Sequence, residues 1–230
     1  MNQKNKVKFS VITVVKNDQN KITKTIKSIL NQSFKNYQYI IIDGNSSDQT
    51  KKKILKYKKK INVFISENDK GIYYAMNKAL KYVKGEIIVF VNSGDTLTRD
   101  ALKEVKKVFN SNTNFDFVFG TVKRHYTKKT LIKHGFNRNR LRYNFDFATS
   151  HSTGFYVKSK FIKRYGKFNT KFKISADYDL YYRLILKNRL TGGSTPKNKI
   201  IGIMSKGGFS SKLSFFEHLK EEIKIRIYNR

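Results

Sequence analysis

A chain of 230 residues is long enough for one α/β domain with a full hydrophobic core but too short for two such domains. Its 39% apolar and 14% aromatic content excludes a disordered protein, and the lack of cysteine excludes a disulfide scaffold, a thiolate metal site and a cysteine nucleophile. Forty-nine Lys and Arg residues against 16 Asp and Glu residues give a formal net charge of +33, which suggests a polyanionic partner, either nucleic acid or an anionic membrane surface.

The basic residues are spread along the whole chain, as in "KNKVK", "KYKKK" and "KEVKK". This spread favours a compositional bias and solvated faces over a dedicated polyanion site. The sequence contains no run of about 18 apolar residues, and its opening "MNQKNKVKFS" lacks the apolar stretch of a signal peptide. We therefore expect a cytoplasmic protein, with peripheral contact at the anionic inner face of the membrane as a further expectation.

Strand and helix patterns alternate through the first half of the chain. The predicted strands are 9–15, 37–43, 61–66, 86–92 and 115–120, and the predicted helices are 20–32, 47–60, 71–85 and 97–110. We expect Ser47 or Asp48 to cap the second helix and Gly85 to end the third in a left-handed conformation. The strands are continuous apolar runs separated by helices, which predicts an α/β fold with a mostly parallel, Rossmann-like sheet covered on both faces.

The second half is less regular. Residues 121–150 are basic and aromatic without periodicity, which indicates loops or short hairpins. A strand over 153–159 and a helix over 177–188 follow, the helix burying Leu180, Leu184 and Ile185. The terminal helix, 214–230, is amphipathic, and its apolar row is more typical of core packing than of a membrane anchor. That row comprises Phe215, Phe216, Leu219, Ile223 and Ile227.

Polar clusters follow three of the predicted strands, at 16–18 ("KND"), 43–46 ("DGNS") and 92–95 ("NSGD"). Ligands of parallel α/β sheets bind beyond the carboxyl ends of the strands, so we expect the three clusters to lie along one edge. Neither a Gly-x-Gly-x-x-Gly turn nor a Walker loop follows the first strand. Dinucleotide-binding and P-loop interpretations therefore lose their main support.

Three of the candidate residues, Asp95, Asp43 and Lys70, each have two interpretations. Asp95, after Gly94, suits a hard cation such as Mg²⁺, which commonly takes one or two carboxylates and fills its shell with phosphates and waters; it could equally cap the next helix. Asp43 could accept hydrogen bonds from a base or ribose, or could belong only to a turn. Lys70 precedes a helix N-terminus that favours an anion, and its alternative is a solvated lysine.

Two further acids, Asp177 and Asp179, stand at the start of a predicted helix. They are two residues apart and therefore point in different directions around it. Either could be a general base, and either could serve only as an N-terminal cap.

Together these segments resemble family 2 glycosyltransferases of the GT-A fold, and most strongly the small bacterial members that build surface polysaccharides. The resemblance covers nearly the whole chain as one domain. It is carried by "FSVITVVKND", "SILNQSFKNYQYIIIDGNSSDQT", "SENDKGIYYAMNKAL", "GEIIVFVNSGD", "SHSTGFYVKSKFIKRYGKFNTKFKISADYDLYYRLI" and "SKGGFSS".

The resemblance implies a nucleotide-sugar donor, for which a UDP-sugar is expected, held by residues 1–120, with the acceptor and the catalytic base on residues 121–230. It implies Asp177 as the base and Asp95 as the ligand of Mn²⁺ or Mg²⁺. The implied nucleotide-sugar-binding residues are Val14, Asp43, Lys70, Asn92 and His151. The expected reaction is an inverting transfer to a hydroxyl of a saccharide or lipid-linked acceptor.

The chain departs from the family pattern in two places. Gly44 stands where many members carry a second Asp, and Asn92 and Gly94 replace the earlier acids of the metal motif, leaving Asp95 as its one full negative charge. Two other functions remain as alternatives. A nucleic-acid-binding protein would account for the charge but would need basic residues clustered on one face, and a sugar-phosphate nucleotidyltransferase would need a glycine-rich first loop that "VVKNDQNK" lacks.

Overall fold

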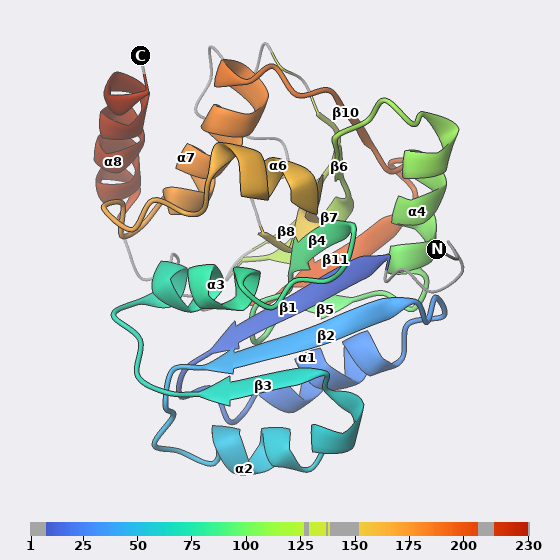
Figure 1. Ribbon diagram of the computed structural model, residues 1–230, viewed down its shortest axis with the longest axis vertical. Coiled ribbons are helices and arrows are strands. Elements are labelled where there is room, and N and C mark those ends of the chain that lie inside the picture. The colour runs from blue at the N-terminus through green and yellow to red at the C-terminus, as the bar shows by residue number, and fades with distance from the viewer. Residues whose placement is uncertain (1–7, 127–128, 137, 139–151, 207–213, 230) are drawn as a thin grey trace.

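The computed structural model describes residues 8–126, 129–136, 138, 152–206 and 214–229. Its centre is a seven-stranded sheet in the order β10-β6-β9-β4-β1-β2-β3, and a four-stranded sheet, β5-β11-β7-β8, stands beside it (Figure 1). The strands of the large sheet are β1 (Phe9–Val15), β2 (Tyr37–Asp43), β3 (Val63–Ser66), β4 (Ile87–Phe90), β6 (Phe117–Phe119), β9 (Phe155–Lys158) and β10 (Gly192–Ser194). Those of the small sheet are β5 (Thr96–Leu97), β7 (Thr121–His125), β8 (Thr130–Lys133) and β11 (Ile200–Met204).

The predicted parallel sheet is confirmed for the amino-terminal half. Strand β1 pairs in parallel with β2 and with β4, and β2 pairs in parallel with β3. Every residue of β1 is buried, as its continuous apolar run predicts for a strand covered on both faces. The carboxyl ends of these strands therefore meet at one edge of the sheet.

Successive side chains of each strand point to opposite faces, which gives the molecule two hydrophobic cores. Ile12 and Val14 of β1 pack in the core that contains α3, α6 and α7, whereas Val11 and Val15 pack in the core that contains α1, α2 and α4. The helices are α1 (Ile22–Leu30), α2 (Thr50–Leu55), α3 (Ile72–Leu80), α4 (Ala101–Ser111), α6 (Ser159–Tyr165), α7 (Ala176–Tyr181) and α8 (Phe215–Tyr228).

The chain order of the strands breaks between the two halves. Strand β9 lies antiparallel between β4 and β6, so a segment from the second half of the chain completes the large sheet. Strand β11 pairs in parallel with β7 and antiparallel with β5, which begins directly after Asp95. These pairings bring segments of the second half beside the carboxyl end of β4.

Several helices of the structure are shorter than the residue ranges predicted from the sequence. The pattern over 47–60 divides into α2 and the 3₁₀ turn η2 (Lys58–Lys60), and the pattern over 177–188 divides into α7 and the π-helical segment η4 (Tyr182–Lys187). The pattern over 97–110 loses its first turn to β5. A second 3₁₀ turn, η3 (Ser152–Gly154), replaces the start of the strand predicted at 153–159. Leu180, Leu184 and Ile185 are buried, as predicted.

One of the two predictions about helix ends was wrong. Helix α3 ends at Leu80, and Gly85 does not have a positive φ. Gly85 instead allows close packing, because a Cβ there would lie 2.4 Å from the carbonyl carbon of Phe9 and from the nitrogen of Ser10. The predicted cap at Asp48 is supported, because the Asp48 carboxylate accepts the N–H of Thr50, the first residue of α2, at 2.9 Å.

The prediction that the apolar row of the terminal helix packs in the core was also wrong. Along α8, Phe216 is 77% exposed and Ile227 is 65% exposed, and Ile223 is also exposed. Ile225, on the opposite side of the helix, is fully buried against the rest of the molecule. In the described part of the chain, no helix combines the length and apolar character needed to cross a bilayer.

Candidate active site

A cavity of about 590 Å³ opens where β1, β2 and β4 end. Both halves of the chain line it. Val14, Lys70, Asn92 and Asp95 come from the first half, and Asp177 comes from the second. The structure thus brings together five of the seven site residues that the resemblance implied.

The other two predicted residues have different positions. Asp43 ends β2 at the same edge of the sheet, but it is fully buried and is not among the described residues that line the cavity. Its carboxylate accepts hydrogen bonds from the Ser66 hydroxyl at 2.7 Å, from the Ser46 N–H at 3.1 Å and from the Ser46 hydroxyl. Gly44, the next residue, lines the cavity in its place. His151 lies outside the described residues.

Asp95 sits in a tight turn between β4 and β5. The turn needs Gly94, whose φ is +96° and whose Cβ would lie 2.6 Å from the Ser205 hydroxyl oxygen. The Asp95 carboxylate accepts the Thr153 hydroxyl at 2.6 Å and the Ser205 N–H at 3.1 Å. Asp95 therefore does not cap α4, whose N-cap residue is Asp100.

Burial raises the pKa of the Asp95 carboxyl to about 6, although its two hydrogen bonds and the nearby cations Arg124 and Lys21 oppose the rise. Both cations also line the cavity, as do Lys16 and Lys70. Four described basic side chains thus border the cavity together with four acids, Asp18, Asp69, Asp95 and Asp177. Basic side chains in such a cavity can bind a multiply charged anion such as a diphosphate.

Asp177 is the second residue of α7 and lies across the cavity on the carboxyl-terminal half of the chain. Its Oδ1 accepts the Tyr178 N–H at 2.9 Å and lies 3.2 Å from the hydroxyl of Tyr73, which donates to the Ile174 carbonyl at 2.7 Å. Burial raises the pKa of the Asp177 carboxyl to about 6. A carboxylate with a pKa near 6 is ionised at neutral pH and basic enough to accept a proton in catalysis.

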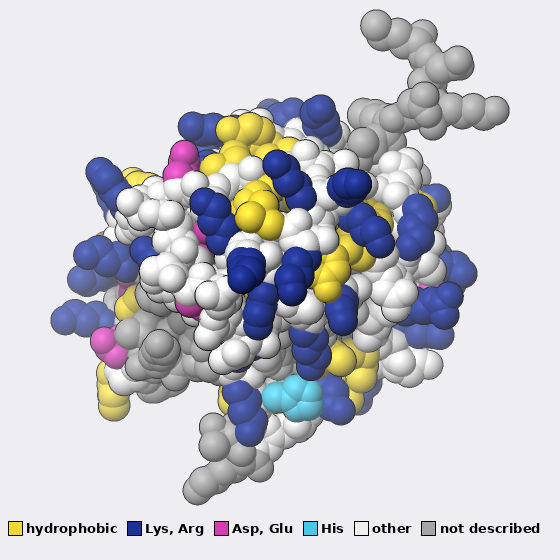
Figure 2. Space-filling model, turned by 90° about the horizontal axis from the view of Figure 1, so that it is seen from below, with side chains coloured by type: hydrophobic (Ala, Val, Ile, Leu, Met, Phe, Trp, Pro, Cys, Tyr) yellow, Lys and Arg dark blue, Asp and Glu magenta, His cyan; other side chains and the backbone are white. Residues whose placement is uncertain are grey.

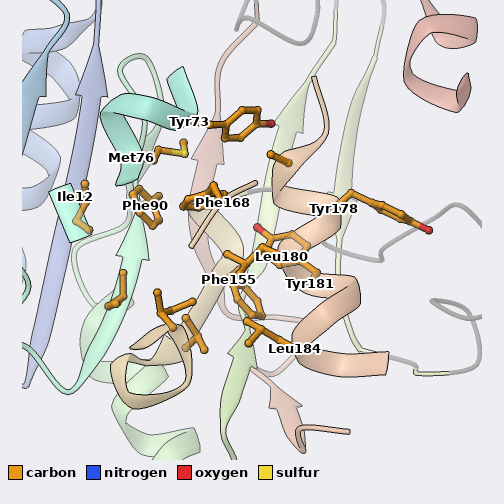
Figure 3. Packing of buried hydrophobic residues seen from close by; sticks show 14 of the residues in the cluster. Ile12, Tyr73, Met76, Phe90, Phe155, Phe168, Tyr178, Leu180, Tyr181 and Leu184 are labelled. Atoms are coloured by element: carbon orange, nitrogen blue, oxygen red, sulfur yellow. The ribbon is translucent and has the colours of Figure 1, made fainter. Parts of the chain in front are cut away.

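Aromatic packing joins α3 and β4 to the segment between α6 and α7. Phe168 packs against both Tyr73, with ring centroids 5.6 Å apart, and Phe90, with centroids 5.2 Å apart (Figure 3). On the far side, Tyr181 of α7 packs against Phe155 of β9 at 4.4 Å. The wall that carries Asp177 therefore rests on the large sheet.

Asp179, the other candidate base, is fully buried and faces away from the cavity. Its carboxylate accepts Arg183 Nε at 2.9 Å and Asn229 Nδ2 at 2.9 Å. An ion pair with this much burial and hydrogen bonding has a structural role, and Asp177 is the acid of this pair that faces the cavity.

Sequence reasoning missed Lys21, Tyr73 and Arg124 as cavity residues. Lys21 and Tyr73 follow polar segments that were recognised as strand ends or helix starts, so their positions could have been suspected. Arg124 belongs to the region without periodicity, and its place depends on the pairing of β7 with β11. No local pattern carries that information.

A mostly parallel sheet with one acid after β4 and another at the start of α7, both facing a cation-lined cavity, defines the GT-A class of glycosyltransferase folds. Residues 10–176 match the family model described as Glycosyl transferase family 2. That segment is well over half of the chain, and the chain belongs to this family.

Two curated relatives, TarS and WfgD, match shorter segments. The chain is 34% identical over 103 residues to the Staphylococcus aureus poly(ribitol-phosphate) beta-N-acetylglucosaminyltransferase TarS, a match that covers 43% of the chain and 18% of TarS. It is 32% identical over 112 residues to the Escherichia coli UDP-Glc:alpha-D-GlcNAc-diphosphoundecaprenol beta-1,3-glucosyltransferase WfgD, covering 48% of the chain and 44% of WfgD. Each match thus spans less than half the length of the relative.

Solved structures confirm the fold. TarS superposes on 96% of the chain and 39% of its own length, with a TM-score of 0.75 and 21% identity. The Pyrobaculum calidifontis mannosyltransferase PcManGT, solved with GDP-Man and Mn²⁺, superposes on 97% of the chain and 65% of its own length, with a TM-score of 0.73 and 16% identity.

Proposed function

We propose that this protein is an inverting glycosyltransferase. It would move a sugar from a nucleoside-diphosphate sugar, most simply a UDP-sugar, to a hydroxyl of a saccharide or lipid-linked acceptor in surface polysaccharide synthesis. Residues 1–120 would hold the donor, and residues 121–230 would supply the base and the acceptor side.

One observation carries the proposal: Asp95 and Asp177 come from opposite halves of the chain, yet both line the same cavity. A single-displacement transfer needs a base on one side of the anomeric carbon and neutralisation of the leaving diphosphate on the other. Lys21 and Arg124 lie close enough to Asp95 to lower its pKa, so basic side chains stand near the acid proposed for the diphosphate side.

In this mechanism Asp177 accepts the proton of the acceptor hydroxyl as its oxygen attacks the anomeric carbon. The bond to the nucleoside diphosphate breaks on the opposite face, which inverts the anomeric configuration. Tyr73 holds the loop before Asp177 through the Ile174 carbonyl, and basic side chains stabilise the charge on the leaving diphosphate.

A divalent cation fits the residues at the end of β4. Among the described residues no three His, Cys, Asp or Glu side chains form a metal-binding group. However, Asn92 Oδ1 is buried without a hydrogen-bond partner within the described structure, and it lines the cavity with Asp95. We propose that these two residues would hold Mn²⁺ or Mg²⁺, with phosphate and water oxygens as the remaining ligands. A bound cation there would neutralise charge on the diphosphate.

Names of the relatives support the substrate class. TarS is named for a beta-linked sugar on poly(ribitol-phosphate), and WfgD for UDP-Glc and a diphosphoundecaprenol-linked acceptor. Structures of TarS are described in complex with UDP and with UDP-GlcNAc. Membership of the family also argues against the nucleic-acid-binding and nucleotidyltransferase alternatives.

A peripheral contact with anionic lipid is a second part of the proposal. Phe216, Ile223 and Ile227 form an exposed apolar row along α8, and Lys220 and Lys224, also exposed, lie beside it at helical spacing. Elsewhere the charge is dispersed. Figure 2, which views the molecule from below, shows Lys and Arg side chains scattered over the face rather than gathered in one row. Dispersed charge adds a weak, salt-sensitive attraction to an anionic surface.

Nucleotide binding tests the donor and metal sites together. We expect UDP to raise the melting temperature more than GDP or ADP, and more with Mn²⁺ than without it. In the Asp95→Ala variant the Mn²⁺-dependent part of the UDP affinity should fall by roughly 10-fold or more, because one of the few charged ligands is lost. Equal UDP affinity with and without Mn²⁺ in wild type and variant would contradict the metal site.

A further inference from the structure

The segment that carries Asp177 into the cavity is held from outside by a residue of the terminal helix. Helix α7 has no side-chain hydrogen bond at its own N-cap, Ser175. Instead, the carboxylate of Glu221 on α8 accepts the N–H groups of Lys173, Ile174 and Ser175, at 2.9, 2.8 and 2.6 Å. Consecutive backbone N–H groups that converge in this way form an anion-binding concavity, and Glu221 fills it.

The same segment is tied to the cavity wall from the other side. The Ile174 carbonyl accepts the Tyr73 hydroxyl at 2.7 Å, and that hydroxyl lies 3.2 Å from Asp177 Oδ1. Ile174, Tyr73 and Asp177 all line the cavity. The position of Asp177 therefore depends on a segment fixed by α3 on one side and by Glu221 on the other.

Helix α8 is itself fixed firmly enough to serve as an anchor. Ile225 is fully buried in the core, Arg226 Nε donates to the Tyr178 hydroxyl at 2.7 Å, and Asn229 Nδ2 donates to Asp179 at 2.9 Å. A capping box between Ser214 and Glu217 begins the helix. The inner face of α8 thus contacts α7 along its length.

We infer that Glu221 is a positioning residue for the transfer reaction, which holds the segment 173–175 and so places Asp177 at the acceptor hydroxyl. This inference rests on the proposed base function of Asp177. Glu221 does not line the cavity, and its effect on the reaction passes through the backbone that it binds.

Loss of Glu221 would affect the rate of transfer rather than donor binding. Without the carboxylate, three N–H groups lose their acceptor and must recruit water or shift. A displacement of about 1 Å at a catalytic group can cost about 100-fold in rate. We therefore expect Glu221→Ala to lower kcat by roughly 10- to 100-fold, with the Kd for UDP unchanged. Glu221→Gln, which keeps one acceptor oxygen at the same reach, should retain much more of the rate.

The pH profile of kcat/KM distinguishes a positioning role of Glu221 from a general effect of the substitution on stability. Asp177 faces Tyr73 on α3, Tyr181 on α7, and His218 and Glu222 on α8, and burial raises its pKa to about 6. If Glu221→Ala lets water reach Asp177, that pKa falls, and the acid limb of the kcat/KM profile moves to lower pH. A variant that is merely less stable keeps the limb in place.

Amide hydrogen exchange tests the anchor without any assay of transfer. In Glu221→Ala, the N–H groups of residues 173–175 should exchange faster than in the wild type. The matched control is Glu104→Ala, which removes a glutamate of α4 that pairs with Lys107 at 2.8 Å and should leave both exchange and kcat unchanged.

The outcomes distinguish the inference from the proposed function. A fully active Asp177→Asn variant would overturn the proposed base and, with it, this inference. An inactive Asp177→Asn variant beside a Glu221→Ala variant with wild-type kcat and wild-type exchange would overturn the inference alone. If Glu221→Ala does not fold, Glu221→Asp, which keeps the charge but shortens the side chain by one methylene, takes its place as the test. An unchanged kcat in Glu221→Asp, with unchanged exchange at residues 173–175, would also overturn the inference.

Discussion

At the scale of single residues, Asp95 and Asp177, two of the four described acids that line the cavity, share one electrostatic feature. Burial raises the pKa of Asp95 and of Asp177 to about 6, even though hydrogen bonds and neighbouring cations pull in the opposite direction. Each carboxylate is therefore costly to ionise in the folded protein without its ligands. Catalytic groups are commonly held at some expense of stability in this way.

This cost predicts a pH-dependent gain of stability for Asp177→Asn. A folded-state pKa above the unfolded value means that the wild type loses stability as the pH rises from about 4 through about 6. The variant escapes that loss, so at pH 8, without metal or nucleotide, it should be more stable by about 1–3 kcal/mol. At pH 4 the two proteins should melt alike. Equal melting temperatures at both pH values would contradict the raised pKa.

Sequence reasoning identified the acids at the strand ends but not what each one touches. Asp95 and Asp177 could be placed because their positions follow from the strand and helix patterns. The contact of Asp43 with Ser66 joins the ends of two neighbouring strands, and the contact of Asp95 with Thr153 spans 58 residues. Such contacts depend on tertiary packing, which no local pattern reports.

At the scale of elements, α8 shows how one helix can serve two surfaces. Its inner side carries the contacts to α7, and its outer side carries Phe216, Ile223 and Ile227. From the sequence, the regular apolar spacing predicted that the outer row was the buried one. Among the described side chains of α8, the fully buried apolar residue is instead Ile225. Polar contacts of Glu221, Arg226 and Asn229 hold the helix in the orientation that buries it.

The two sides of α8 predict opposite mutational behaviour. Ile225→Ala should destabilise the protein by about 2–5 kcal/mol, because it leaves a cavity in the core. The double change Phe216→Ser and Ile227→Ser should alter stability by less than about 0.5 kcal/mol per site. It should nevertheless reduce binding to phosphatidylglycerol vesicles by about 10-fold or more, because two inserted apolar side chains are lost.

Vesicle sedimentation at low and high salt measures this difference. The matched control is Leu55→Ser, which changes an exposed apolar side chain on α2 and should leave vesicle binding intact. If the double variant sediments with anionic vesicles as well as the wild type does, α8 is not the lipid contact.

At the scale of the whole molecule, the parallel strands and their covering helices could be predicted from the sequence. The way in which strands of the second half complete the sheet could not. Apolar runs alternating with helices determine β1, β2, β3 and β4 almost directly. The insertion of β9 between β4 and β6, and the small sheet built around β11, depend on pairings between distant segments. These pairings bring the second half of the chain to the carboxyl-terminal edge of the parallel strands, where both halves line the cavity.

In the proposed mechanism, donor binding and proton transfer are separable functions of the two halves of the chain. The most direct test measures UDP affinity by calorimetry and sugar transfer by turnover in the single variant Asp177→Asn. We predict that the affinity for UDP with Mn²⁺ is unchanged and that transfer falls by at least about 100-fold, because the base is lost while the donor site is intact. Transfer at the wild-type rate, or loss of UDP binding together with transfer, would contradict the account.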